Sequence, residues 1–313
     1  STTSLQAADQ AGISAPLLSR RVPTGARLVD CWEWGGGADR VRPIALDIHP
    51  SGVVAGIEVR QHRLFLVSAD GSWIGFGEQG RTDLGFATRV FARSGLQLFT
   101  LDPQERAVDR FNLRGIWEYR LDLEEIASDA GEELGEIVDL CLDRTGDLFL
   151  LDAGKAQILR IGRTGDLQQV LGKWGDWTMQ VPVALDVDGQ GKLYVLETRP
   201  PGLLILDYDG HMLGWRAATA GGDESLQPTA LAVDAWGNAF LADAHTGALK
   251  VLPAASGAAW WIQPPGGEKI RASDLVVDKA ERLLVADADA ARVWVFALDY
   301  NTEVPADVPG SGP

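Results

Sequence analysis

Six acidic residues recur along the chain at intervals of 44 to 50 residues, each at the end of a short apolar segment. Carboxylate oxygens are the ligands that hard cations such as Ca²⁺ prefer, and they also accept hydrogen bonds from backbone amides in turns. Glu58 precedes Arg63, and Asp287 precedes Arg292, by the same short interval, which fits pairing across a turn. We therefore expect these acids to anchor turns. The alternative is that they are metal ligands, in which case the cofactor would be Ca²⁺. The six residues are Glu58, Asp102, Asp152, Glu197, Asp243 and Asp287.

A second set of aspartates lies at the opposite end of the same units. They are Asp143, Asp188, Asp234 and Asp278, each three residues before the position that glycine occupies in most copies. An aspartate followed by glycine at this distance is typical of a tight turn, because the side chain accepts hydrogen bonds from the turn amides. We expect a structural role for these four residues.

An internal repeat positions both sets of acids. Each copy begins with an apolar strand, continues through a short polar turn into a second strand that ends on the acid, and adds a third and a fourth strand. Five of the six turns carry glycine, which permits the positive φ that a tight hairpin needs; the sixth carries Glu281. The glycines are Gly52, Gly95, Gly146, Gly191 and Gly237. A period of this length with four short strands indicates the blade of a β-propeller.

The sixth copy lacks a fourth strand at the C-terminal end of the chain. The segment 28–34, followed by three glycines, resembles the other fourth strands. We therefore predict an all-β, six-bladed β-propeller with four antiparallel strands per blade, in which an N-terminal strand closes the last blade and removes an open edge. Residues 1–26 would form an arm, 27–298 a single propeller and 299–313 a tail.

The strand pairs at 191–197, 237–243 and 283–296 look like those of the NHL repeat. The segment 73–80 resembles the outer strand and glycine exit of that repeat, and the resemblance covers residues 28–298. It implies a six-bladed propeller but not one activity, since such propellers act both as binding platforms and as enzymes.

Propeller enzymes offer two kinds of metal site for comparison with this sequence. The gluconolactonase-like group binds a metal through Glu, Asn and Asp, but here Asn112 and Asn238 fall in turns and Asn301 falls in the tail. Propeller lyases bind zinc through clustered histidines, whereas His49 and His211 fall at one end of the strands and His62 and His245 at the other. Sequence motifs for a serine nucleophile, a phosphate loop or a zinc pair are absent. We expect no catalytic residue, with a metal-dependent hydrolase or lyase acting on a lactone, ester or sugar acid as the alternative.

Partner-binding candidates lie outside the regular pattern. Most tryptophans recur in fourth strands, where a large ring packs against the next blade, but Trp177 falls in a connection between blades and Trp236 in a hairpin turn. An acidic insertion at 121–136 contains Glu124, Glu125, Glu132 and Glu133, and part of it could form a short helix on the rim. We interpret the two tryptophans as candidate contacts for a partner. For the insertion a solvated loop is the first interpretation, and a docking element that uses these glutamates is the alternative.

Composition restricts the partners. With 28 basic and 44 acidic residues the net charge is −16, which disfavours nucleic acids and anionic membranes and favours basic protein surfaces. The longest apolar runs, such as 203–206, are too short for a membrane span, and two cysteines cannot form a disulfide framework. The sequence shows no leader peptide, and we favour an extracytoplasmic compartment over the cytoplasm. The resulting hypothesis is a non-catalytic binding or scaffold propeller that recognises a protein partner, as a subunit of a larger assembly.

Overall fold

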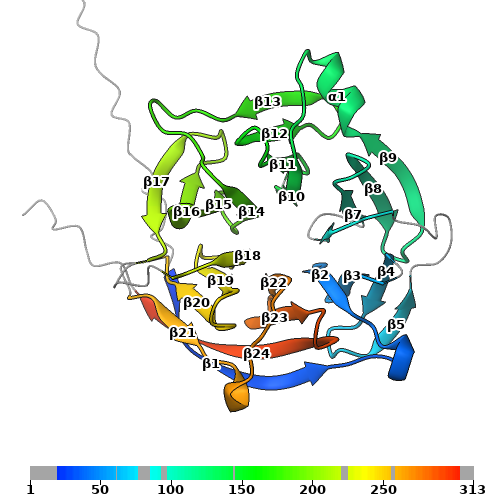
Figure 1. The fold of residues 1–313 in the computed structure, drawn as a ribbon, viewed down its shortest axis with the longest axis vertical. Coiled ribbons are helices and arrows are strands. Elements are labelled where there is room, and N and C mark those ends of the chain that lie inside the picture. Colours follow the sequence, from blue (N-terminus) through cyan, green and yellow to red (C-terminus); the bar gives the residue numbers. More distant parts are fainter. Residues whose placement is uncertain are drawn as a thin grey trace, which may run out of the picture.

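Within the described residues, the strands form six four-stranded antiparallel sheets. The computed structural model describes residues 20–60, 62–76, 85–92, 97–143, 145–219, 225–254 and 258–303. Figure 1 shows the sheets arranged as blades around a central axis, following the chain from blue to red. The prediction of an all-β, six-bladed β-propeller is confirmed.

The blades follow one another in chain order, and in each the first strand lies innermost. Blade 1 contains β2 (Pro43–Ile48), β3 (Val54–Glu58), β4 (Arg63–Val67) and β5 (Trp73–Phe76). Blade 2 contains β6 (Arg89–Phe91), β7 (Gln97–Asp102), β8 (Ala107–Asn112) and β9 (Trp117–Asp122). Blade 3 contains β10 (Ile137–Leu142), β11 (Leu148–Asp152), β12 (Gln157–Ile161) and β13 (Leu167–Leu171). Blade 4 contains β14 (Pro182–Val187), β15 (Leu193–Thr198), β16 (Pro201–Leu206) and β17 (Met212–Ala217). Blade 5 contains β18 (Pro228–Val233), β19 (Ala239–Asp243), β20 (Leu249–Leu252) and β21 (Trp260–Ile262). Blade 6 combines β22 (Asp274–Val277), β23 (Arg282–Asp287) and β24 (Arg292–Glu303) with β1 (Arg20–Trp32) from the start of the chain.

The two ends of the chain close the ring as expected, but the paired region is longer than the sequence indicated. β1 pairs with β24 from Trp32 opposite Val293 to Arg20 opposite Glu303. The pairing therefore continues past residues 26 and 298, where we had placed the arm and the tail. Residues 1–19 and 304–313 lie outside the described part of the chain. We call the two strands together the terminal ribbon.

The second strands form the most deeply buried layer of the blades. Every residue of β3, β11 and β19 is buried, including the acid at the end of each. Apolar side chains of neighbouring blades meet in shared clusters, one of which joins Phe91 of blade 2, Phe149 of blade 3 and Val195 of blade 4. Burial of this apolar surface is the main stabilising contribution to the ring.

The hairpin turns confirm the role of the glycines in the four copies that the structure describes. Gly52, Gly146, Gly191 and Gly237 have φ values of 85° to 91°, a region that favours glycine. Glu281, which replaces glycine in the sixth copy, also has a positive φ of 61°. Gly95 lies outside the described residues.

Part of the acidic insertion is helical, as the sequence suggested. The helix α1 (Leu123–Asp129) begins at Asp122, whose side chain accepts a 3.0 Å hydrogen bond from the backbone N–H of Glu125. Leu123 and Ala127 are buried against blades 2 and 3, while Glu124 and Glu125 face solvent. No helix in the described ranges is long and apolar enough to cross a membrane.

Candidate functional site at the axis

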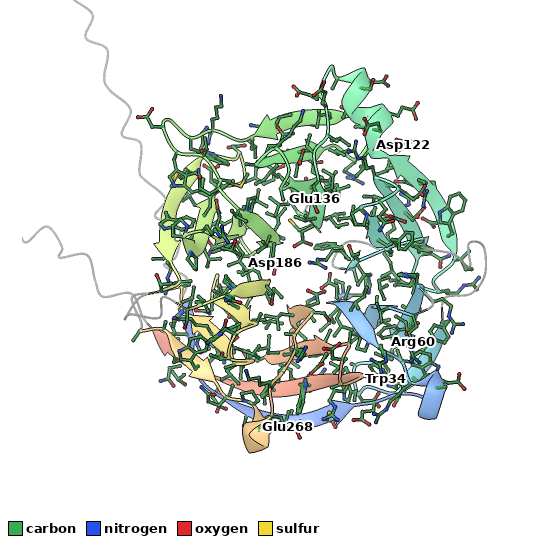
Figure 2. All side chains as sticks on the ribbon, in the orientation of Figure 1. Trp34, Arg60, Asp122, Glu136, Asp186 and Glu268 are labelled. Carbon is green, nitrogen blue, oxygen red and sulfur yellow. The ribbon has the colours of Figure 1, made fainter. Side chains whose placement is uncertain are left out.

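Aspartates of the innermost strands tie neighbouring blades together around the axis. Each accepts a hydrogen bond from a backbone N–H of the next blade's innermost strand or of the residue that follows it. The pairs are Asp47 with Ala92 (2.7 Å), Asp139 with Leu185 (2.8 Å), Asp186 with Val233 (2.7 Å) and Asp274 with Leu46 (2.9 Å). Figure 2 shows Asp186 at the inner edge of its blade. We did not predict a role for these residues from the sequence, although an aspartate inside an otherwise apolar strand was the available signal.

Arg89 of β6 is the cation that balances two of these aspartates. Its Nε lies 3.2 Å from Oδ1 of Asp139, and its charge also acts on Asp274. Burial raises the pKa of Asp139, and it raises the pKa of Asp274 to about 7, although the charge of Arg89 opposes both shifts. One guanidinium thus lies near two carboxylates, and a pKa of about 7 places the titration of Asp274 near neutral pH.

An axial cavity of about 530 Å³ opens where the innermost strands end. Five blades contribute to it, and its walls combine aliphatic side chains with a rim of charged and polar groups. The main lining residues are Ile48, Leu142, Val187 and Val233 on the walls, with His49, Asp143, Asp188, Asp234, Asp278 and Arg282 on the rim. A concave, largely apolar site with a few convergent polar groups is typical of a ligand-binding site.

Three of the four rim aspartates have hydrogen-bond partners for both oxygens. Oδ2 of Asp188 accepts from the hydroxyl of Tyr194 at 3.1 Å, and Oδ2 of Asp278 accepts from Nε of Arg282 at 2.7 Å. Oδ2 of Asp234 accepts from the Tyr300 hydroxyl at 2.9 Å. Their Oδ1 atoms accept from turn amides, as we expected of these residues.

Asp143 differs from the other three. Its Oδ1 accepts hydrogen bonds from three backbone N–H groups and from the hydroxyl of Thr145. Its buried Oδ2 has no hydrogen-bond partner among the described residues. The residue is only 4% exposed. Blade 3 has Phe149 where blade 4 has Tyr194, so the hydroxyl that serves Asp188 has no counterpart beside Asp143. A buried carboxylate oxygen without a donor favours a ligand that supplies one.

The six acids at the ends of the second strands lie away from this cavity. Antiparallel pairing places them opposite the start of the innermost strand, as with Pro182 and Glu197. Five of the six accept a hydrogen bond from a backbone N–H of the connection that enters their own blade: Asp102, Asp152, Glu197, Asp243 and Asp287. The sixth, Glu58, accepts a hydrogen bond from the backbone N–H of Arg60. These bonds join each second strand to neighbouring loops, which is the geometry of turn anchors. Calcium binding at these positions stays the alternative hypothesis.

The other polar candidates are dispersed. His49 lies on the cavity rim, His62 packs edge-on against Phe86, and His211 is exposed beside Asp207. Asn238 is buried and donates to the backbone oxygen of Arg21 at 2.8 Å. In the part of the chain that the structure describes, no three His, Cys, Asp or Glu side chains group as metal ligands.

The structure places the expected partner-binding residues at three separate locations. Trp177 is half-buried between Trp174 and Trp215, with ring centroids 5.6 Å from each. Trp236 is half-buried under the terminal ribbon, where the centroid of its ring lies 5.3 Å from that of Tyr300. Glu124, Glu125, Glu132 and Glu133 remain exposed, although Glu124 pairs with Arg106 and Glu133 with Lys155.

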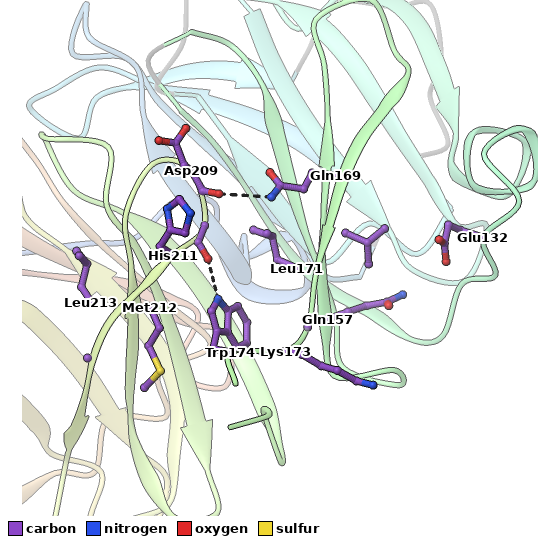
Figure 3. Close-up of a pocket in the computed structure, with 14 residues that line it drawn as sticks. Glu132, Gln157, Gln169, Leu171, Lys173, Trp174, Asp209, His211, Met212 and Leu213 are labelled. Atoms are coloured by element: carbon purple, nitrogen blue, oxygen red, sulfur yellow. Dashed lines mark hydrogen bonds between the residues drawn. The ribbon is translucent and has the colours of Figure 1, made fainter. Parts of the chain in front are cut away.

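Glu132 also borders a groove of about 1160 Å³ between the outer strands of blades 3 and 4. Two hydrogen bonds join the sides of this groove (Figure 3). Gln169 donates to the backbone oxygen of Asp209 (3.4 Å), and Trp174 donates to the backbone oxygen of Gly210 (2.7 Å). The groove is more open and its lining is less apolar than that of the axial cavity, so the axial cavity is the better-formed site.

The comparisons with known proteins show the fold. No protein-family model and no curated protein sequence matches the chain. Among solved structures, virginiamycin B lyase from Staphylococcus aureus is similar with a TM-score of 0.64 and 12% identity over 86% of this chain and 99% of that chain. A protein of unknown function from Bacteroides thetaiotaomicron has a TM-score of 0.61 and 16% identity over 89% and 76%. The Cps50 (Swd1) β-propeller domain from Myceliophteria thermophila has a TM-score of 0.61 and 11% identity over 88% and 100%. A lyase and proteins whose names state no activity thus share this fold, so the fold alone does not decide the function of this chain.

Proposed function

We propose that the chain is a non-catalytic binding propeller that recognises a basic protein partner at its axial cavity, as a subunit of a larger assembly. The observation that carries the proposal is the buried Oδ2 of Asp143, which has no donor among the described residues. Asp143 is one of the residues that line the axial cavity, together with aliphatic side chains. A partner loop with an apolar residue beside a lysine or arginine would fill the cavity and supply the donor.

Charge supports a basic partner. The chain has a net charge of −16, and the exposed acids of the insertion add a negative region on the outer side of blades 2 and 3. Complementary charge accelerates encounter and selects against acidic partners. The NHL-like strand pattern is compatible with this proposal, because propellers of that type include binding platforms as well as enzymes.

Peptide binding tests the proposal directly. The probe is a fluorescein-labelled peptide of leucine, lysine and leucine with blocked ends, and a second peptide with norleucine in place of lysine reports the contribution of the charge. We expect fluorescence anisotropy to show saturable binding of the lysine peptide. Asp143→Asn should weaken it about tenfold or more, because a hydrogen bond to a charged group contributes about 1.5–3 kcal/mol.

Two further variants separate the role of Oδ2 from general effects of charge. Phe149→Tyr keeps the carboxylate of Asp143 but introduces a hydroxyl equivalent to that of Tyr194, which donates a hydrogen bond to Oδ2 of Asp188 in blade 4. This hydroxyl should donate to Oδ2 of Asp143 in place of the ligand, so the variant should also bind the peptide more weakly. Asp39→Asn removes one exposed charge outside the cavity and should leave affinity unchanged. Equal affinity for the two peptides, or for wild type and Asp143→Asn, would show that the cavity does not recognise a basic partner.

A metal-dependent hydrolase or lyase remains the second candidate. Two observations favour it: the fold is similar to that of a lyase, and His49 lies buried on the cavity rim. Elemental analysis of the native protein, combined with a screen of lactones, esters and sugar acids, tests this candidate. A stoichiometric metal together with turnover would show that the protein is an enzyme and would overturn the binding proposal. Peptide binding without turnover would support the binding proposal.

A further inference from the structure

A second, smaller cavity lies beside Glu197, away from the axial cavity. Its volume is about 220 Å³, and it is formed by the connection that enters blade 4, the turn after β15 and the outer strand β17. Its lining residues are Asp176, Trp177, Thr178, Gln180, Glu197, Pro200 and Trp215. The cavity has no basic side chain in its lining, although it contains two carboxylates.

Glu197 differs from the equivalent acids in other blades. Its Oε2 accepts the backbone N–H groups of Gln180 at 2.8 Å and Val181 at 2.9 Å, whereas its buried Oε1 has no hydrogen-bond partner in the described ranges. The residue is 1% exposed, and burial raises the pKa of its carboxyl group. In Asp243, by contrast, both oxygens accept hydrogen bonds. The Oε1 atom of Glu197 therefore favours a ligand that supplies a hydrogen-bond donor, because the described residues supply none.

Two tryptophans form the aromatic wall of this cavity. The rings of Trp177 and Trp215 meet at 45° with centroids 5.6 Å apart. Backbone hydrogen bonds of 3.0 and 3.1 Å pair Trp177 with Trp174 and hold the connection in a tight turn. Trp215 lies directly against Gly202, where an added Cβ would be 2.3 Å from the ring. Both rings are thus held in place by the backbone around them.

This combination selects a particular chemistry. Aromatic faces attract cations, and an unpaired buried carboxylate oxygen gains most from a charged donor. A primary ammonium group offers both a positive charge and three N–H donors. A quaternary ammonium lacks the donor, and an anion would be repelled by Asp176 and Glu197.

We propose that the cavity between Trp177, Trp215 and Glu197 binds a primary alkylammonium group, which is either a free amine or the side chain of a lysine on a partner protein. This site is separate from the axial cavity and does not depend on the function proposed there. It also gives Trp177 a defined role, since a half-buried ring can bind the ligand while it packs on Trp215.

The indole N–H signals of the tryptophans provide the test, because a ligand in this cavity lies against two identified rings. The protein is labelled with ¹⁵N-tryptophan, and the signals of Trp177 and Trp215 are assigned with the variants Trp177→Phe and Trp215→Phe. n-Butylammonium chloride is then titrated at constant ionic strength, with 1-butanol and tetramethylammonium as controls. We expect the two assigned signals to shift in a saturable manner with butylammonium and to shift much less with either control.

Glu197→Gln keeps the size of the side chain and an oxygen for the backbone amides, but it removes the charge. We expect it to weaken butylammonium binding at least tenfold. Trp177→Leu is the second variant and should weaken binding severalfold, because it removes one aromatic face. Asp166→Asn, an exposed acid in the turn between β12 and β13, is the matched charge control and should bind as wild type does. Circular dichroism and thermal melting verify that each variant is folded.

A blocked glycine–lysine–glycine peptide distinguishes the two sources of the ammonium group. Tighter binding of this peptide than of butylammonium, lost when the lysine is acetylated, would indicate a partner lysine. Binding of butylammonium without binding of the peptide would indicate a free amine. Absence of saturable shifts at Trp177 and Trp215, equal shifts with 1-butanol, or unchanged binding in folded Glu197→Gln would each overturn the proposal.

Discussion

The hydroxyl of Tyr300 donates a 2.9 Å hydrogen bond to Oδ2 of Asp234, and so joins the terminal ribbon to the hairpin of blade 5. The guanidinium of Arg21 lies 5.1 Å from the ring centroids of both Tyr300 and Trp236, and the backbone oxygen of Arg21 accepts from Asn238. The ribbon therefore closes blade 6 and also covers the neighbouring blade. Because Asp234 lines the axial cavity, this contact connects ring closure to the candidate site.

Tyr300→Phe tests the contribution of that contact to stability. The substitution keeps the ring packing and removes one hydrogen bond to a buried carboxylate, so we expect the free energy of unfolding to fall by about 1.5–3 kcal/mol. Chemical denaturation measures the change. Tyr119→Phe is the control, because the contact of Tyr119 with Arg110 uses the ring and not the hydroxyl. Equal effects of the two substitutions would show that the Tyr300 hydroxyl does not secure the ribbon.

The raised pKa of Asp274 predicts a pH-dependent stability. Burial raises this pKa from 3.8 to about 7, with Arg89 opposing and Asp139 adding to the shift. The folded state therefore binds more protons than the unfolded state between about pH 4 and pH 7, and the contribution of Asp274 to stability falls as pH rises through that window. Asp274→Asn has no proton to lose at this position. We expect its free energy of unfolding to decline less than that of wild type across the window.

Denaturant unfolding at several pH values measures this difference in slope. Asp139 also has a raised pKa and remains in the variant, so part of the decline should persist. Asp166→Asn, which changes an exposed carboxylate, should follow the wild-type slope. Parallel curves for wild type and Asp274→Asn would contradict the assignment of the raised pKa to Asp274.

Gly56 and Phe65 form a cross-strand pair in blade 1 that requires the absence of a side chain. A Cβ added at Gly56 would lie 2.2 Å from the Phe65 ring, and both residues are buried. We expect Gly56→Ala to lower the free energy of unfolding by about 1–3 kcal/mol or more through overpacking. Gly36→Ala is the matched control, because its Cβ would meet nothing within 4 Å. A thermal melt in which both variants match wild type would show that blade 1 can repack around Gly56.

The anchoring hydrogen bonds of the second-strand acids predict a weak response to calcium. Asp152, for example, already accepts from Gly135, Lys155 and Gln157. We therefore expect the melting temperature of the native protein to be the same in excess calcium and in chelator. A calcium-dependent rise that Asp152→Asn or Glu197→Gln abolishes would instead identify these acids as metal ligands, because a ligand specific for the folded state stabilises it.

The sequence by itself determined the number of blades, their order and the closure of the ring by an N-terminal strand. The number and order of the blades follow from patterns within each unit: strand alternation, hairpin glycines and an acid at a fixed place, all of which depend on contacts between residues close in sequence. Ring closure instead pairs residues 20–32 with 293–303, and it was predictable because the segment 28–34 resembles the other fourth strands. A short helix in the acidic insertion was also expected, from the apolar residues Leu121, Ile126 and Leu134. The structure shows that Leu123 and Ala127 are the buried residues of that helix.

Only the tertiary structure decided which polar groups meet and which lack a partner. Asp139, Arg89 and Asp274 come from blades 3, 2 and 6, and their proximity depends on how the ring curves. The repeat made Asp143 and Asp188 look equivalent, and the same was true of Glu197 and Asp243. The three-dimensional neighbours separate them: Phe149 replaces a hydroxyl donor beside Asp143, and no residue that the structure describes donates to Oε1 of Glu197. Hydrogen-bond satisfaction depends on atoms that approach from other blades, and a repeat read along the chain does not specify that arrangement.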